Sequence, residues 1–188
     1  MGSEMCIRDR NFASVSSMTK MLSATIMQVA VSSVKVGLKV KPVSYTHLTL
    51  HYPAGTRLIA ADPDLALQTR LRDRFYDHYV MEPMQKIVTD KLRPAGANDP
   101  HGVAQAKAML LTAYGMIEAE MATRSWAVGD PFSMADCAAA PSLFYANLVL
   151  PLADAHPVAA AYLNRLMARP SFARVVQEAQ PYFALFPG

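Results

Sequence analysis

The apolar positions after residue 61 recur at the steps of amphipathic helices. Asp62 and Pro63 have the residue types preferred at a helix start. The stripe that follows has four residues at a spacing of four, Leu67, Leu71, Phe75 and Tyr79, and is widened by Tyr76, Val80, Ile87 and Val88. It predicts a helix from about residue 63 to 92. We expect a bend at Pro83, because proline has no backbone N–H to donate.

A second amphipathic stripe follows the loop at residues 93–98. Its apolar members, at steps of three and four, are Val103, Ala106, Leu110, Ala113, Ile117 and Met121. They predict a helix from about residue 99 or 100 to 123–125, after which Val128–Pro131 reads as a turn.

The third predicted helix begins with a capping pattern. Ser133 is followed three residues later by Asp136, so each side chain can reach the other's backbone N–H as in a capping box. Phe132 and Cys137 stand at the positions of a hydrophobic staple. Asp136 is the one charged residue between residues 134 and 150, which predicts a helix buried on all sides, with a bend at Pro141.

Two shorter helices complete the prediction, at residues 158–168 and 170–179. An aromatic tail follows, with Tyr182, Phe183 and Phe186. We therefore expect residues 51–188 to form one all-α domain, a bundle of about five helices.

Residues 1–50 do not fit this pattern. Their apolar positions keep no regular period, although alternation at residues 34–40 is compatible with a strand or hairpin. The pieces at 5–10 and 43–50 resemble translated sequencing-adapter read-through of the kind found in metagenomic gene models; a genuine variable N-terminus is the alternative. We expect an irregular segment, artefactual in origin on the first interpretation.

Charge and cysteine content exclude several classes of function. Residues 1–50 hold six Lys and Arg against two Asp and Glu, whereas residues 51–188 hold twelve against thirteen. The nearly neutral folded part predicts no nucleic-acid partner. No segment is long and apolar enough to predict a membrane span. Only two cysteines occur, Cys6 and Cys137, without a CxxC pair, as is typical of a cytoplasmic protein.

Metal ligation and catalysis find little support in the residue pattern. His47 and His51 are four apart, but their segment does not read as a helix, and we predict no metal site. Ser133 and Asp136 could be read as a hydroxyl beside a general base, but the cap explains both. Cys137 could be a thiol activated by a helix N-terminus, although the staple position favours an inert side chain. We assign no catalytic residue.

The run Gly129-Asp-Pro-Phe-Ser-Met-Ala-Asp-Cys137 resembles the capping motif in the C-terminal domain of glutathione S-transferases. The order of helices, the segment His51–Gly55 as a linker and Asn164–Phe172 near the end are also similar to that family. The resemblance implies a cytoplasmic enzyme that joins the thiolate of glutathione, its co-substrate, to a small hydrophobic electrophile. It also implies a possible homodimer.

One departure from the family pattern limits this interpretation. Members carry a thioredoxin-like first domain of roughly eighty residues, which binds glutathione and supplies the catalytic hydroxyl or thiol. Residues 1–50 are too short for it and show no βαβ order. We therefore expect the glutathione site to be absent and the chain to be inactive alone. The alternatives are a non-catalytic helical interaction module and a truncated gene product without a function of its own.

The resemblance implies that the first long helices and the tail line a pocket for the electrophile. The candidate substrate-binding residues are Arg72, Phe75, Tyr76, Tyr79, Tyr114 and Phe183. For Phe75 and Tyr79, core packing is the simpler interpretation. Arg72 belongs to a charged run, residues 70–77, which reads as a solvated helix face or as part of a dimer cleft. Phe183 and Phe186 either cover the pocket or seal the core.

Overall fold

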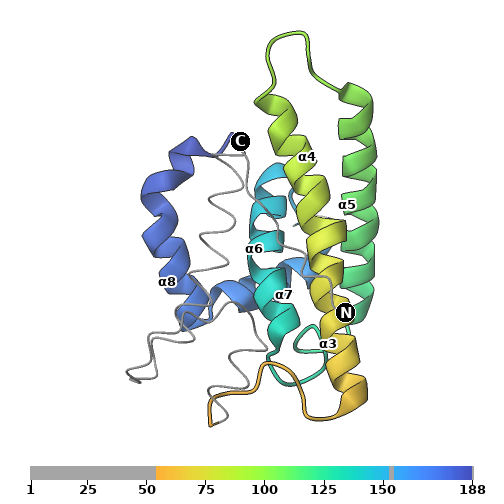
Figure 1. Ribbon diagram of the computed structural model, residues 1–188, viewed down its shortest axis with the longest axis vertical. Coiled ribbons are helices and arrows are strands. Elements are labelled where there is room, and N and C mark those ends of the chain that lie inside the picture. Colours follow the sequence, from red (N-terminus) through yellow and green to blue (C-terminus); the bar gives the residue numbers. More distant parts are fainter. Residues whose placement is uncertain (1–53, 153–154, 188) are drawn as a thin grey trace, which may run out of the picture.

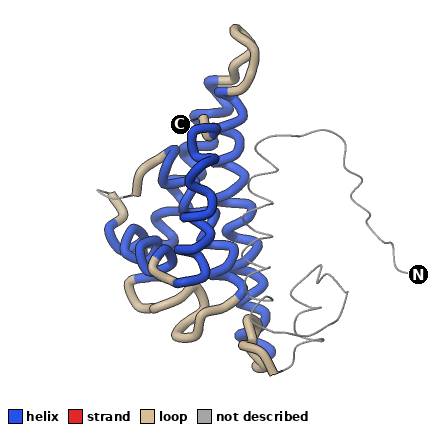
Figure 2. The backbone as a smooth tube through the Cα atoms, turned by 90° about the vertical axis from the view of Figure 1, so that its left-hand side faces the viewer, coloured by secondary structure: helices blue, strands red, loops and turns tan. Residues whose placement is uncertain are grey.

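The computed structural model describes residues 54–152 and 155–187, and in these residues the regular secondary structure is helical, without a strand (Figures 1 and 2). The all-α prediction is therefore confirmed for the described part. The expectations for residues 1–50, including Cys6, His47, His51 and the adapter-like pieces, lie outside the described residues.

The first predicted helix forms as one column of three parts, α3 (Pro63–Phe75), a π-helical turn η1 (Tyr76–Met81) and α4 (Glu82–Lys91) (Figure 1). Asp62 caps it by accepting from the Leu65 backbone N–H at 2.9 Å. In the wide turn the Glu82 N–H donates five residues back, to the Asp77 carbonyl. The π turn comes just before Pro83, where the α-helical hydrogen bond is impossible. The column thus accommodates the proline by widening.

The spacing-of-four stripe does not mark the buried face of this column. Leu67, Leu71 and Tyr79 are 65%, 63% and 52% exposed, whereas Phe75 is 8% exposed. The predicted core role is therefore wrong for Tyr79. A step of four residues advances about 40° beyond a full turn, so a strict stripe drifts around the helix. Most of the buried residues instead follow one another at mixed steps of three and four: Ala66, Thr69, Asp73, Tyr76, Val80, Met84 and Ile87. Phe75, Pro83 and Val88 are buried beside them.

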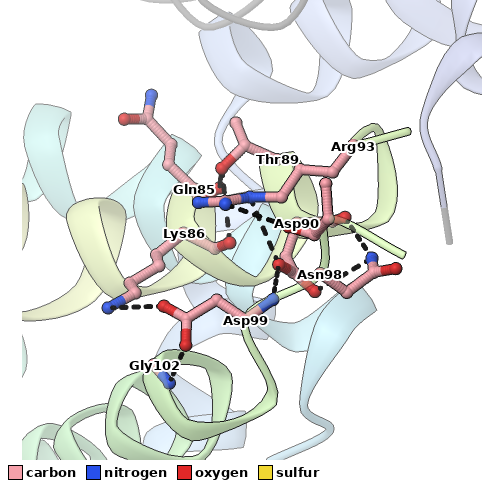
Figure 3. A network of polar contacts seen from close by, with 9 residues as sticks. Gln85, Lys86, Thr89, Asp90, Arg93, Asn98, Asp99 and Gly102 are labelled. Atoms are coloured by element: carbon pink, nitrogen blue, oxygen red, sulfur yellow. Dashed lines mark hydrogen bonds and ion pairs between the residues drawn. The ribbon is translucent and has the colours of Figure 1, made fainter. Parts of the chain in front are cut away.

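Helix α5 (Pro100–Met121) runs back along α4, and its buried residues include nearly all of the predicted stripe. The connection between them projects at one end of the molecule (Figure 2) and is held by side chains (Figure 3). Asp90 accepts from the Asp99 backbone N–H at 2.7 Å and pairs with Arg93 at 3.3 Å. Asp99 in turn caps α5 by accepting from the Gly102 N–H at 2.8 Å. These bonds fix where α4 ends and α5 begins.

Helix α6 (Met134–Val149) is the central element. It packs against α3, η1, α4 and α7, and in Figure 1 it stands between the α4–α5 pair and α8. Most of its residues are buried, as the sequence predicted. Pro141 lies inside it without ending it.

Helix α7 (Pro157–Met167) and α8 (Pro170–Ala179) follow, and the tail forms a 3-10 turn, η2 (Gln180–Leu185). The start of α7 is capped from a distance. The Glu118 carboxylate, on α5, accepts from the backbone N–H groups of Val158 at 3.1 Å and Ala159 at 2.8 Å. This carboxylate joins α5 to α7 and satisfies N–H groups that a helix start leaves without partners.

None of the helices in the described residues has the length and apolarity needed to cross a bilayer. The same residues contain no cluster of three or more His, Cys, Asp or Glu side chains able to hold a metal ion.

Candidate functional site

The start of α6 is organised around one buried carboxylate, that of Asp136. Its Oδ2 accepts from the Ser133 backbone N–H at 2.8 Å and from the Ser133 hydroxyl at 2.9 Å, in the arrangement of a capping box. Its Oδ1 accepts from the Ala127 N–H at 2.8 Å and from the Tyr162 hydroxyl at 2.6 Å. The carboxylate therefore joins α6 to the preceding loop and to α7, and all four hydrogen bonds are internal to the protein.

The two residues of the suggested staple are placed differently. Phe132 is half-buried, and its ring meets Trp126 edge-on at 5.3 Å between centroids. Cys137 is buried at the fourth position of α6. A direct contact between Phe132 and Cys137 stays a prediction.

Two candidate substrate residues, Tyr76 and Tyr114, lie in the core. The Tyr114 hydroxyl donates to the Leu150 carbonyl at 3.0 Å. The Tyr76 hydroxyl interacts with that of Tyr162. Burial raises the pKa of Tyr76 and of Tyr114 far above the ordinary tyrosine value. Both hydroxyls therefore interact with partners in the core, and the two side chains pack inside the bundle.

Three other candidates meet on the α3–η1 surface. The Phe75 and Tyr79 rings stack with centroids 5.6 Å apart, and the Arg72 guanidinium lies 5.6 Å from the Phe75 ring centre. Arg72 also pairs with Glu120 of α5. The ring of Phe75 is buried and that of Tyr79 is half-exposed, so a flat, uncharged molecule can approach this group from the side of Tyr79.

The charged run that contains Arg72 is only partly a solvated face. Asp73 is buried and pairs with Arg74 at 2.6 Å, and Arg74 also pairs with Asp77 at 2.7 Å. Burial raises the pKa of Asp77, while Arg74 acts in the opposite direction. Arg72 itself is mostly buried in its pair with Glu120.

Phe183 belongs to a different group, an aromatic cluster between α6, α8 and η2. Phe144 of α6 meets Phe172 at 6.1 Å and Phe183 at 5.7 Å, and Tyr145 meets Phe186 at 5.2 Å. The Tyr145 hydroxyl is buried without a hydrogen-bond partner, and burial raises its pKa to about 12. Sequence reasoning did not single out Phe144 or Tyr145, which it had included among the apolar residues of a core helix.

The six candidate residues therefore fall into three places. Arg72, Phe75 and Tyr79 lie together on α3 and η1, Tyr76 and Tyr114 lie in the core, and Phe183 lies in the aromatic cluster.

Comparison with known proteins places this arrangement in a class. Residues 100–165 match the family model described as the glutathione S-transferase C-terminal domain. No curated protein matches the chain by sequence. The described helices therefore form an α-helical bundle of the transferase C-terminal type.

Solved structures with the same fold agree. A glutathione S-transferase from Methylobacterium radiotolerans, in complex with glutathione sulfonate, has a TM-score of 0.67 at 22% identity, over 82% of this chain and 90% of that one. One from Methylobacillus flagellatus, with glutathione bound, has 0.63 at 18%, over 82% and 94%. Glutathione S-transferase III in its apo form has 0.64 at 20%, over 90% and 93%. The described helices therefore have the fold of these glutathione S-transferases, and residues 100–165 match the model of their C-terminal domain.

Proposed function

We propose that the chain supplies the electrophile-binding half of a glutathione S-transferase, with glutathione as the co-substrate. The supporting observation is the family match over residues 100–165, which includes the capped, buried helix α6. Two similar proteins are described with glutathione or its sulfonate bound. The enzyme's acceptor is a small hydrophobic electrophile, and its location is the cytoplasm.

The proposed acceptor-binding residues lie in two apolar groups. Phe75 and Tyr79, with Arg72 at their edge, are one candidate surface, and Phe183 in the aromatic cluster is the other. Tyr76, whose ring meets that of Phe75 edge-on at 5.4 Å, supports the first surface from the core, whereas Tyr114 is held in the core by the Leu150 carbonyl. Substitution of Tyr79 or of Phe183 by Ser, each tested alone, should weaken binding of an apolar fluorescent probe. Tyr182→Ser, at an exposed position of η2, is the matched control.

The catalytic part of the proposal is that this chain alone has little transferase activity. The family's reaction needs a hydrogen-bond donor that lowers the thiol pKa of glutathione, and we assign no such residue here. The test is retention of the full chain on immobilised glutathione and turnover of a chlorodinitrobenzene-type substrate. We expect background turnover and no retention; robust activity would mean that the chain carries a complete glutathione site.

A second candidate function is a protein-interaction module, including a homodimer. The exposed leucines on α3, Leu67 and Leu71, favour it, because apolar side chains one turn apart give an association surface. Sedimentation of the chain and of its Leu67→Ser/Leu71→Ser variant tests this second function. If the variant is monomeric where the natural chain associates, the module is supported. If both are monomeric, it is not.

A further inference from the structure

Two arginines gather around the aromatic side chains beside the start of α6. The Arg165 guanidinium carbon lies 5.9 Å from the Trp126 ring centre and 5.8 Å from that of Tyr162. The Arg169 guanidinium carbon lies 5.5 Å from the Trp126 ring centre and 3.6 Å from that of Phe132. Both cations therefore share the indole of Trp126.

Neither arginine forms an ion pair with a described Asp or Glu side chain. Several other arginines do: Arg72, Arg74, Arg93 and Arg174. The Arg169 Nε is buried without a hydrogen-bond partner. The nearby Asp136 carboxylate accepts hydrogen bonds from Ser133, Ala127 and Tyr162. It forms no ion pair with either arginine. Two formal positive charges are left uncompensated.

The helix dipoles at this place do not remove the imbalance. Arg165 is in the last turn of α7, whose carboxyl end carries about half a negative charge, and Arg169 is the residue before α8, whose amino end carries about half a positive charge. The two partial charges oppose one another. Contacts with aromatic faces orient the guanidinium groups but bring no formal negative charge.

We propose that Arg165 and Arg169, on the platform of Trp126 and Phe132, bind an oxyanion, either a carboxylate or a phosphate group. Guanidinium groups present paired N–H donors whose geometry matches both kinds of oxyanion. Stacking holds these donors in place, so less conformational freedom is lost on binding. Arg165 is exposed and Arg169 is partly exposed, so an anion can approach from solvent. This site is independent of the proposed transferase function and uses none of its candidate residues.

The site contains its own reporter, because Trp126 is the one tryptophan of the chain. The full chain is titrated with inorganic phosphate and, separately, with acetate, at an ionic strength held constant with chloride, while indole emission is followed. We expect a saturable change in emission with at least one of the two anions, and the arm with the lower apparent Kd identifies the source. Absence of saturation in both arms overturns the proposal.

Variants separate a specific site from a general effect of charge. Arg165→Gln should raise the apparent Kd at least tenfold, and Arg169→Lys, which keeps the charge but loses the paired donors, should also raise it. Arg174→Gln is the matched control, because Arg174 is exposed and paired with Glu178 at 3.4 Å. It should leave the Kd unchanged. Equal titration curves for the natural chain and Arg165→Gln would overturn the proposal.

A second readout guards against an emission change unrelated to binding. An anion that binds only the folded chain raises its midpoint of thermal unfolding in a concentration-dependent way. The natural chain and Arg174→Gln should show this rise, and Arg165→Gln should show much less of it. A rise of equal size in all three chains would also contradict the site.

Discussion

Two regions of the bundle bury tyrosine hydroxyls in opposite ways. Around the start of α6, the Tyr162 hydroxyl donates to Asp136, and further along the core the Tyr114 hydroxyl donates to the Leu150 carbonyl. In the aromatic cluster of α6, α8 and η2, the Tyr145 hydroxyl has no partner. A buried hydroxyl without a hydrogen-bond partner destabilises the folded state, whereas a hydrogen-bonded one stabilises it. The first region is therefore a structural joint, and the second tolerates a polar atom that it does not use for folding.

The largest expected effect comes from the joint. Asp136→Ala removes one carboxylate and leaves four donors without their acceptor, on Ser133, Ala127 and Tyr162. We expect a loss of about 3–5 kcal/mol in the free energy of unfolding, because a buried donor left without an acceptor costs about 1–3 kcal/mol and the protein relaxes around only some of the four. Urea denaturation measures it.

Asp130→Ala is the control for that variant, because Asp130 is exposed in the loop before α6. A surface substitution of this kind changes the free energy of unfolding by about 0.5 kcal/mol or less. A similar small loss in Asp136→Ala would show that the carboxylate is not a structural joint.

The joint was also the part of the molecule that could best be predicted from the sequence. Ser133 and Asp136 are three residues apart, so the capping arrangement depends on local geometry that a sequence displays directly. The partners of the second oxygen, Ala127 and Tyr162, come from other segments and could not be foreseen. Glu118 is a similar case, because its cap on α7 joins residues 40 positions apart.

The buried face of the first column was harder to predict from the sequence, for a related reason. A run of apolar residues at a spacing of four identifies a helix correctly, but which side is buried depends on the helices that pack against it. Leu67 and Leu71 lie outside the face that α6 covers, and Tyr76 and Val80, which only widened the predicted stripe, lie in it. The candidate site was divided for the same reason, since Phe183 lies against α6 and not against Phe75.

The second prediction tests the paired tyrosine. Tyr114→Phe removes the bond to the Leu150 carbonyl and leaves that acceptor without its donor. We expect a loss of about 1–2 kcal/mol in the free energy of unfolding, measured by urea denaturation. Tyr182→Phe, at an exposed ring, should change nothing measurable. Equal stabilities of the Tyr114→Phe variant and the natural chain would remove the distinction between the two regions.

The third prediction has the opposite sign. Tyr145→Phe removes a buried hydroxyl that has no partner and keeps the ring that packs on Phe144 and Phe186. We expect the free energy of unfolding at neutral pH to stay the same or to rise by up to about 1 kcal/mol, because an unfavourable desolvation is removed. A loss as large as that of Tyr114→Phe would mean that the hydroxyl has a partner in solution.

The smallest expected effect is a difference in how the free energy of unfolding depends on pH in the natural chain and in the Tyr145→Phe variant. Burial raises the pKa of Tyr145 from its ordinary value of 10.0 to about 12, so the unfolded chain loses this proton first. The contribution of Tyr145 is fully present below pH 10 and is lost as the pH rises toward about 12, because ionisation then favours the unfolded state. Tyr76, Tyr114 and Tyr162 act in the same direction. Comparison with the Tyr145→Phe variant separates the effect of Tyr145 from that of the other tyrosines. The free energy of unfolding of the variant, measured by urea denaturation, should fall less steeply over this pH range than that of the natural chain. Parallel profiles would place the Tyr145 hydroxyl in water, where the second region would no longer differ from an ordinary surface.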